Sequence, residues 1–442
     1  MVCTGARIFL ESLKREGVDL FFGYPGGAVI DIYNELSSHP DIRHILVRHE
    51  QGAVHAADGY ARASGKVGVC LATSGPGATN TVTGIATAYS DSIPLVIFTG
   101  QVSTPLIGND AFQEVDIVGI TRPCTKHNFL VKDVKDLALT IRKAFYLARS
   151  GRPGPVLVDI PKNIQQATCD YVWPENVSMR SYCPTYRANL NQLRRAMDVL
   201  VTSRKLLVMA GGGVIMADAA EELTMLARRL HAPVTSTLMG LGAFPGDDPQ
   251  WIGMLGMHGT YAANRAVTQA DVILAVGARF DDRVTGKLST FAPNARIVHI
   301  DIDPTTLRKN VRVEVPVVSD ALSALQGLRA ILESGHAEKD WEGAHAEWNA
   351  QVREWQERQP LSWARGETLK PQQVVEALYR MTEGKAVITT EVGQNQMWAA
   401  QFYKYHRPRT YLTSGGLGTM GYGLPAAIGA QLAFPDRLVV DV

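Results

Sequence analysis

The feature that most constrains the fold is a regular alternation, between residues 18 and 165, of short apolar runs with segments of helical spacing. Strands that alternate with helices form a parallel sheet, because the right-handed crossover between neighbouring strands carries the helix. The alternation therefore predicts an α/β domain with a doubly wound parallel sheet over residues 1–165. Its strands are expected at 18–22, 45–47, 67–73, 94–99 and 156–160.

A second unit of the same kind is expected at 186–335. The stretch 171–184, with Pro, Asn and Ser, breaks the alternation and predicts an interdomain linker before it. The unit's strands are expected at 205–209, 233–237, 272–276 and 297–302, with a helix at 217–230.

The remaining sequence predicts a third, incomplete unit at 369–442. The charged, Trp-bearing stretch 339–365 predicts a helical linker before it. A helix near Lys370, a strand at 386–389 and a glycine-rich run at 414–423 follow, and 437–442 has the pattern of a buried strand. About 70 residues are too few to close such a sheet. We therefore expect three consecutive doubly wound parallel-sheet domains, the third incomplete.

Charge and cysteine content narrow the class of protein. The 442 residues carry 44 Lys and Arg against 43 Asp and Glu, a formal net charge of +1, with no basic run, so neither nucleic acid nor a membrane is an expected partner. No apolar run approaches the roughly 18–20 residues that span a bilayer. The five cysteines are odd in number and lack CxxC spacing, which argues against a disulfide framework and a zinc site. We expect a cytoplasmic protein.

Most strands of the first unit end in a loop that contains glycine: GYPGG at 23–27, SGPGATN at 74–80 and GQ at 100–101. For any single loop, a tight turn after a strand is the simpler interpretation. Because the carboxyl ends of parallel strands share one edge of the sheet, the repeated loops predict a crevice there.

Glu50 stands at this edge, between the run 45–47, which has the composition of a buried strand, and an alanine-rich helix. Most Glu residues in a first helical turn complement the helix dipole. The alternative is an acid–base group, since close packing against alanines would remove the carboxyl from water. Position alone favours the dipole interpretation.

Several motifs, in order along the chain, resemble the thiamine diphosphate enzymes of the acetohydroxyacid (acetolactate) synthase family. They are RHEQGA at 48–53, SGPGATN at 74–80, DAFQE at 110–114, GRPGPV at 151–156 and GGLGTMGYGLP at 415–425. GARFDDRVTG at 277–286 is similar to the biosynthetic, flavin-containing large subunit in particular. The resemblance covers residue 23 to the last residue.

The resemblance implies that pyruvate is decarboxylated on thiamine diphosphate and that the resulting two-carbon unit joins pyruvate or 2-oxobutyrate, in branched-chain amino acid biosynthesis. In this family the Glu that matches Glu50 bonds a ring nitrogen of the cofactor's aminopyrimidine, and burial suits a carboxyl to that role. The resemblance also implies FAD without a redox role, Mg²⁺, a homodimer or dimer of dimers, and a possible small regulatory subunit.

The resemblance assigns the site residues by matching position. The expected catalytic residues are Glu50, Gly27, Gln113 and Arg283, and the expected substrate channel residues are Phe112, Lys162 and Met257. Thiamine diphosphate is expected at Gly26, Gly393, Gln394, Asn395, Gly418 and Met420. FAD is expected at Arg152, Gly211, Gly212, Thr237, Leu238, His258, Arg279, Asp301, Ile302 and Asp320.

Taken one at a time, these residues have ordinary structural interpretations. Arg283 in the Asp281–Asp282 context would form a loop ion pair, although its planar fork also suits the carboxylate of the second substrate. Met257 alone would fill a core. The glycines at 211–213 lack the full GxGxxG pattern, since Met216 stands at its last position, so they are a weak dinucleotide signal.

The sequence departs from the family pattern in three places. Asn395 stands where many members carry His, and Ser103 where many carry Pro. The Gly-Asp-Gly motif that supplies metal ligands is expected directly beyond Val442, so no residue of this sequence is predicted to bind the metal. We therefore expect an apparently truncated chain with little or no activity alone.

Four other functions compete with this hypothesis. Pyruvate oxidase shares the fold and cofactors, but the run 279–286 disfavours it, and Glu50 disfavours glyoxylate carboligase, which lacks that glutamate. A noncatalytic FAD-binding protein would use only the first two domains. A simple Rossmann dehydrogenase is disfavoured by the absent fingerprint.

Overall fold

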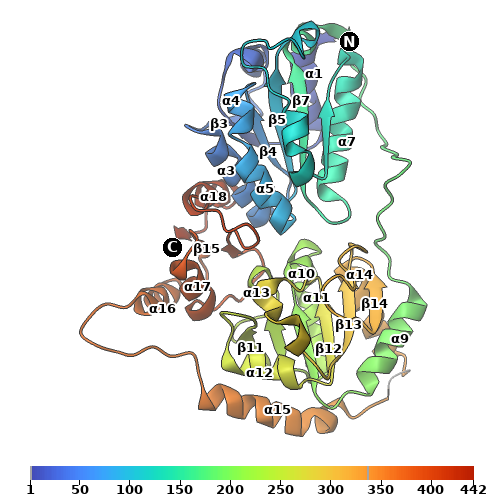
Figure 1. The fold of residues 1–442 in the computed structure, drawn as a ribbon, viewed down its shortest axis with the longest axis vertical. Helices are drawn as coiled ribbons and strands as arrows, with labels where there is room; N and C mark the ends of the chain where they lie inside the picture. Colours follow the sequence, from blue (N-terminus) through green and yellow to red (C-terminus); the bar gives the residue numbers. More distant parts are fainter. Residues whose placement is uncertain (1, 336–337) are drawn as a thin grey trace. The chain divides into compact units, whose positions relative to one another are not determined.

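The computed structural model describes residues 2–335 and 338–442, and the chain divides into two compact units. The first unit comprises residues 2–183, 389–392 and 412–441, and the second comprises 184–388, 393–411 and 442. Each contains a six-stranded sheet with helices on its faces, which confirms the predicted α/β class (Figure 1). The predicted boundaries 1–165, 186–335 and 369–442 stay a prediction. Among the described residues, no helix is both long and apolar enough to cross a membrane.

The large sheet of the first unit is parallel throughout, in the order β3-β2-β4-β5-β7-β6. Its strands are β2 (Leu20–Gly23), β3 (Arg43–Leu46), β4 (Gly68–Ala72), β5 (Leu95–Gln101), β6 (His127–Leu130) and β7 (Pro155–Pro161). Its helices are α1 (Gly5–Arg15), α2 (Ile30–Leu36), α3 (Glu50–Ser64), α4 (Pro76–Thr79), α5 (Val82–Asp91), α6 (Ile117–Thr121), α7 (Leu137–Arg149) and α8 (Lys162–Gln166). The antiparallel pair β1 (Val2–Thr4) and β8 (Thr168–Asp170) forms a separate small sheet.

The strands of this sheet whose positions and burial were both predicted correctly are the central ones. Every residue of β4, β5 and β7 is buried, as expected of central parallel strands covered by helices on both faces, and their apolar runs are continuous. The prediction of a buried strand at 45–47 was wrong. This segment ends β3, an edge strand on which Leu46 is 51% exposed.

The second unit has the sheet order β11-β10-β9-β12-β13-β14, again parallel, in which the direction of strand succession reverses between β9 and β12. Its strands are β9 (Leu206–Ala210), β10 (Val234–Ser236), β11 (Trp251–Met254), β12 (Val272–Val276), β13 (Arg296–Asp301) and β14 (Val315–Val318). Its helices are α9 (Leu190–Val201), α10 (Gly212–Met216), α11 (Ala220–Arg229), α12 (Tyr261–Gln269), α13 (Asp282–Thr285) and α14 (Ala321–Glu333).

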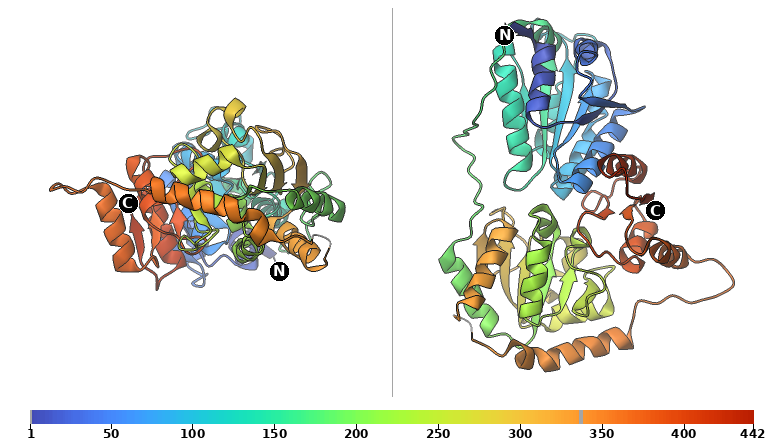
Figure 2. Two further views of the ribbon diagram at one scale, coloured as in Figure 1. Left: turned by 90° about the horizontal axis from the view of Figure 1, so that it is seen from below. Right: turned by 180° about the vertical axis from the view of Figure 1, so that it is seen from behind.

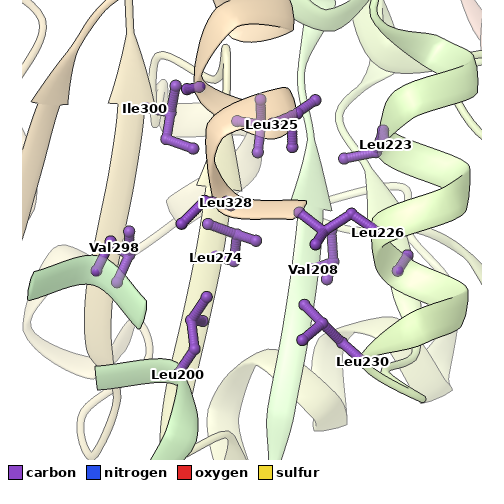
Figure 3. Close-up of a cluster of buried hydrophobic side chains, with 14 of the residues drawn as sticks. Leu200, Val208, Leu223, Leu226, Leu230, Leu274, Val298, Ile300, Leu325 and Leu328 are labelled. Carbon is purple, nitrogen blue, oxygen red and sulfur yellow. The ribbon is translucent and has the colours of Figure 1, made fainter. Parts of the chain in front are cut away.

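One face of this second sheet is covered by helices that supply leucines to a common core. Leu200 comes from α9, Leu226 from α11 and Leu328 from α14, and all three pack over Val208 and Leu274 of the central strands (Figure 3). Each of these side chains is almost completely buried. The predicted helix at 217–230 is α11, which begins three residues later than expected.

The stretch predicted as a helical linker is α15 (Trp341–Arg358), and the structure corrects its role. The Trp348 indole donates to the carbonyl of Leu206, the first residue of β9, at 2.9 Å. Gln356 donates to the Trp251 carbonyl, at the start of β11. The helix therefore packs along the amino-terminal edge of the second sheet, as both views show (Figures 1 and 2).

The C-terminal segment contributes a smaller sheet in the order β16-β15-β17. Its elements are α16 (Pro371–Thr382), β15 (Val387–Thr389), α17 (Gln394–Phe402), β16 (Tyr411–Leu412), α18 (Gly423–Ala433) and β17 (Val439–Asp441). The strand predicted at 437–442 is present as β17, but it is half-buried to exposed rather than buried.

A buried carboxyl in the first sheet makes stability depend on pH. Asp159 of β7 accepts hydrogen bonds from Thr99 and Gln101, and burial raises its pKa from the ordinary 3.8 to about 7. The folded protein therefore holds the proton more tightly than the unfolded chain. The resulting stabilisation is complete below about pH 4 and is lost as the pH rises through 7.

We expect the Asp159→Asn variant to lose this pH dependence, because its amide keeps the shape of the protonated acid. At about 1.4 kcal/mol per pKa unit, its unfolding free energy at pH 8 should exceed that of the unchanged protein by roughly 4 kcal/mol. Urea unfolding at pH 5 and pH 8 measures the difference. Parallel pH profiles for the two proteins would contradict the assignment.

Candidate active site

The loops that follow β2, β3, β4, β5 and β7 meet at the carboxyl edge of the first sheet. This edge includes the point between β2 and β4 where the direction of strand succession reverses, which is where open α/β sheets bind ligands. Contacts between these loops, described below, confirm that the glycine-bearing turns predicted from the sequence converge.

Glu50 begins α3, as the sequence predicted, and its side chain is buried, with 7% of its surface exposed. Its Oε2 accepts a hydrogen bond of 2.9 Å from the Asn80 side chain, in the loop after β4. A Cβ added to Gly77 would lie 3.2 Å from Oε1, so the carboxyl is closely covered there by main chain. The alanines that follow in α3 are also buried and permit this packing. Glu50 is thus held in an enclosed position rather than at a solvent-exposed helix end.

The loop after β2 places Gly26 and Gly27 in different surroundings. A Cβ on Gly26 would come within 2.6 Å of the Thr73 side chain, whereas a Cβ on Gly27 would contact nothing within 4 Å. Thr73 also accepts a hydrogen bond from the Ala28 amide. Lys162 donates to the Gly27 carbonyl at 3.2 Å, which brings an expected channel residue to this loop. Gly27 therefore faces open space beside a fixed backbone.

Gln113 lies against the loop after β4. It has a left-handed backbone, with φ of 59°, and a Cβ added to Gly75 would lie 2.8 Å from its carbonyl oxygen. Gln113 itself belongs to the loop after β5, which is closed by the Glu114 carboxylate. This carboxylate accepts hydrogen bonds from the amides of Gly108 and Ala111, and these bonds lower the pKa of Glu114. Phe112 is 88% exposed, so the structure places its ring toward solvent.

The sequence did not predict a buried network of charged side chains on α3, the helix that begins at Glu50. Arg62, four residues after Asp58 on α3, donates to Asp58 at 2.5 Å and to Asp91 at 2.9 Å. The Tyr422 hydroxyl donates to Asp58 at 2.7 Å. The i,i+4 spacing of Asp58 and Arg62 was the available sequence signal, but it does not reveal burial or the partners on other elements.

This network also fixes the glycine-rich run at 414–423. The amides of Gly415 and Gly416 donate to the two oxygens of Asp91, at 3.0 and 2.7 Å. Helix α18 packs on α3 through small residues, since a Cβ on Gly59 would lie 2.2 Å from the Ala426 carbonyl oxygen. The run is therefore held by its main-chain amides, and a Cβ added to Gly416 would lie 2.8 Å from an Asp91 carboxylate oxygen.

Two of the five residues predicted to bind thiamine diphosphate in the C-terminal segment, Gly393 and Gly418, have a positive φ. Gly393 (φ 150°) precedes Gln394, the first residue of α17, and Asn395 donates to the Val442 carbonyl. Gly418 has φ of 71°, and Met420 is 78% exposed. Within residues 2–335 and 338–442 there is no group of three His, Cys, Asp or Glu side chains that could hold a metal ion.

Arg283 and Met257 lie together in the second unit. The Met257 amide donates to the Arg283 carbonyl at 2.8 Å, and a Cβ on Gly256 would lie 2.3 Å from that oxygen. The guanidinium of Arg283 is 3.1 Å from Asp282, and both side chains are mostly exposed. Arg283 thus makes the loop ion pair that was one of its two predicted roles. Its exposed guanidinium group remains accessible to a ligand.

The residues expected to hold flavin divide between the units. Arg152 lies in the first unit, where it donates to Ser92 at 2.8 Å. The other nine expected residues, from Gly211 to Asp320, lie in the second unit. Of these, Gly211 follows β9 at the reversal point, and a Cβ on it would lie 2.0 Å from the carbonyl oxygen of Gly277, after β12.

Further flavin candidates surround this same edge. The Thr237 amide donates to the carbonyl of Ala210, which brings the loop after β10 beside β9. Asp301 ends β13 and is largely buried, and Asp320 caps α14, where burial raises the pKa of its carboxyl. Arg279 lies 3.8 Å from Asp281, and the His258 carbonyl accepts from Gln401.

Comparison with known proteins agrees with this arrangement. Three family profiles match: the N-terminal TPP binding domain of thiamine pyrophosphate enzymes at residues 3–120, their central domain at 193–328, and their C-terminal TPP binding domain at 391–442. Together they cover most of the chain.

Individual relatives are similar along nearly all of it. The acetolactate synthase isozyme 3 large subunit of Escherichia coli is 53% identical over 99% of this chain and 77% of its own length. The acetolactate synthase large subunits of Haemophilus influenzae and Mycobacterium tuberculosis are 50% and 49% identical, each over 99% of this chain and over 77% and 71% of their lengths. The chain belongs to the acetolactate synthase large-subunit family of thiamine diphosphate-dependent enzymes.

Proposed function

We propose that this protein decarboxylates pyruvate and joins the two-carbon product to pyruvate or 2-oxobutyrate, with Glu50 as its acid–base residue. Family membership makes it an enzyme that forms a carbon–carbon bond. The observation that carries the assignment of Glu50 is its burial beside Asn80 at the carboxyl edge of the first sheet.

The residues around Glu50 fit the aminopyrimidine of thiamine diphosphate. The planar aminopyrimidine needs an enclosed carboxyl near its ring nitrogen and main chain close to its face. Glu50 supplies the carboxyl. Gly26 and Gly77 supply the close main chain, since a Cβ on either glycine would lie 2.6 Å from the Thr73 side chain. When bound, the cofactor supplies an electron sink for the decarboxylation. Glu50 would hold a proton between its carboxyl and the ring nitrogen, and the surrounding loops would exclude water from this exchange.

Other residues would position the 2-oxo acids. Gly27 faces open space, where its amide could donate to a developing oxyanion. Gln113, Phe112, Lys162 and Met257 would line the path of the substrates. Arg283 would hold the carboxylate of the second substrate, because a guanidinium fork matches a carboxylate in two bonds.

We propose FAD, without a redox role, as a second cofactor in the second unit. The sheet order of this unit is that of dinucleotide-binding folds, and Gly211 and Gly277 allow close backbone approach where such ligands bind. Arg152, Gly212, Thr237, Leu238, His258, Arg279, Asp301, Ile302 and Asp320 remain proposed contacts. The binding of Mg²⁺ to the cofactor's diphosphate stays a prediction, and no residue of this chain is assigned as a ligand of the metal.

The names of the relatives also suggest an assembly. They are called large subunits, which implies a smaller partner and an oligomer. We propose a homodimer or dimer of dimers with a possible small regulatory subunit, in the cytoplasm.

A single assay tests the proposed reaction. Because the sequence predicts little turnover by these 442 residues alone, the assay must detect slow product formation: the purified chain, given thiamine diphosphate, Mg²⁺, FAD and pyruvate, is expected to form acetolactate slowly and without consuming oxygen. Oxygen uptake with peroxide would indicate a pyruvate oxidase instead. Bound FAD with no calorimetric signal on addition of thiamine diphosphate would favour the noncatalytic flavin-binding alternative and overturn the proposal.

Replacing Arg283 with Gln is expected to raise KM for the second 2-oxo acid about 10- to 100-fold with a smaller change in kcat, because a charged contact to a carboxylate contributes about 1.5–3 kcal/mol. Steady-state kinetics with 2-oxobutyrate as the varied acceptor measures this. The matched control is Asp282→Asn, which removes the ion-pair partner but keeps the guanidinium. An unchanged KM in Arg283→Gln would remove Arg283 from the substrate site.

A further inference from the structure

A cavity of about 530 Å³ lies on the flank of the second sheet, and none of the residues expected to contact either cofactor lines it, although Asp320 lies two residues from the lining residue Val318. Its walls come from the segment before α9, the first two turns of that helix, the loop after β13 and the edge strand β14. The lining residues are Thr185, Arg187, Asn189, Asn191, Gln192, Arg195, Pro304, Leu307, Arg308, Pro316 and Val318. Small-molecule sites commonly have volumes of about 300–1,000 Å³.

The charge of this cavity is positive and uncompensated. Three arginines, Arg187, Arg195 and Arg308, line it, whereas no Asp or Glu does. Among the described parts of the chain, these three guanidinium groups have no ion-pair partner. The first turn of the 12-residue α9 carries no acidic residue, and Asn189 caps it through the amides of Asn191 and Gln192. The helix dipole therefore adds to the positive potential.

Four of the lining residues, Pro304, Leu307, Pro316 and Val318, are apolar and together are called the apolar wall. On β14, Pro316 and Val318 alternate with buried residues and so share the outer face of the edge strand. Pro304 and Leu307 come from the loop after β13. A ligand in the cavity would thus meet both guanidinium groups and apolar side chains.

The walls are fixed by hydrogen bonds. The Asp320 amide donates to the Tyr186 carbonyl at 3.0 Å, and the Ala188 amide donates to Ser323 at 3.1 Å, which ties the segment before α9 to α14. In the loop after β13, Asp303 accepts from the amide of Thr305 at 2.9 Å. The cavity is therefore a built concave surface rather than a gap between mobile loops.

Arg308 is held at a costly backbone position. Its φ is 63°, in the left-handed region that favours glycine, and no glycine relieves it. A residue other than glycine or asparagine at such a position costs roughly 1 kcal/mol or more. Nine other non-glycine residues of the described chain share a positive φ, so the backbone alone assigns no role; it makes Arg308→Gly a variant that removes the guanidinium and relieves the backbone.

We propose that this cavity binds a phosphorylated organic anion of nucleotide size, with its phosphates on the three arginines and its organic part on the apolar wall. Guanidinium forks bind phosphate oxygens in pairs of hydrogen bonds, and three of them suit a diphosphate better than a single carboxylate. The ligand is distinct from substrate and from both proposed cofactors, so the site would serve regulation or anchoring.

Titration calorimetry with UDP, on protein saturated with FAD so that the proposed flavin site is filled, tests this proposal. UDP is expected to bind with a Kd of about 0.1 mM or tighter, which corresponds to roughly 5.5 kcal/mol. Uridine should not bind. Pyrophosphate should bind more weakly than UDP, because it leaves the apolar wall uncovered, and equal affinity would overturn the organic part of the proposal.

Three variants separate binding from folding. Arg187→Gln and Arg195→Gln should each weaken UDP binding about tenfold. Arg308→Gly should weaken it similarly while leaving Tm unchanged or higher, because glycine relieves the backbone. Arg229→Gln, an exposed arginine at the end of α11 outside the cavity, is the control and should bind UDP normally. No binding by the unchanged protein, or equal binding in all four variants, would overturn the site.

Discussion

Replacing Glu50 with Gln is expected to slow acetolactate formation by about 10²–10⁴-fold, the usual contribution of a positioned acid–base group. The amide keeps the size of the side chain, and its oxygen can still accept from Asn80, so the fold and the affinity for thiamine diphosphate should change little. What the amide cannot do is exchange a proton with the aminopyrimidine nitrogen.

A second measurement makes this prediction independent of turnover. Exchange of the cofactor's thiazolium C2 hydrogen with deuterium, followed by NMR after acid quench, should slow by a similar factor in Glu50→Gln. Glu221→Gln, at an exposed position in the first turn of α11, is a matched control that should leave both rates unchanged. If Glu50→Gln exchanges at the unchanged rate with cofactor bound, Glu50 is a helix-dipole residue and not the acid–base group.

Replacing Arg62 with Met is expected to lower the free energy of unfolding by about 3–5 kcal/mol, the usual cost of removing one partner from a buried ion pair. Arg62 is 4% exposed and bridges Asp58 and Asp91, which are buried. Methionine fills much of the volume but leaves two carboxylates without their cation.

The same variant should loosen the glycine-rich run. Asp91 accepts from Gly415 and Gly416, so hydrogen exchange of the amides in 414–423 is expected to rise. The control is Lys66→Met, whose ion pair with Asp19 is more than half exposed on both sides and should contribute less than about 1 kcal/mol. A loss below 1 kcal/mol in Arg62→Met would show that the network does not support the first unit.

Most strands predicted from the sequence are those whose surroundings are uniform; the edge strand β3 and the partly exposed β17 were also predicted, but their burial was not. The strands β5, β9 and β12 are buried on both faces, so each leaves a continuous apolar run. The sequence missed β6, β11 and β14, which lie at the edges of their sheets. Edge strands are covered on fewer sides, so their sequences mix polar residues, Gly or Pro with apolar ones, as in HNFL, WIGM and VPVV.

Local features of the candidate active site could be predicted from the sequence, but contacts between distant residues could not. The position of Glu50 in the first turn of α3 was expected and is confirmed, and its burial agrees with the acid–base interpretation that position alone did not favour. Its partner Asn80 lies 30 residues away, and no local pattern links the two. The roles assigned by resemblance, from Gln113 to the flavin contacts, stay predictions.

The sequence by itself determined that this protein is a parallel α/β protein of the acetolactate synthase large-subunit family, because strand–helix alternation and ordered motifs are local properties. Only the tertiary structure decided that β3 is an edge strand, that Arg62 joins Asp58 to Asp91, and that three arginines line one cavity. These depend on strand order and on contacts between distant segments, and a periodic pattern along the chain carries no information about which segments become neighbours in space.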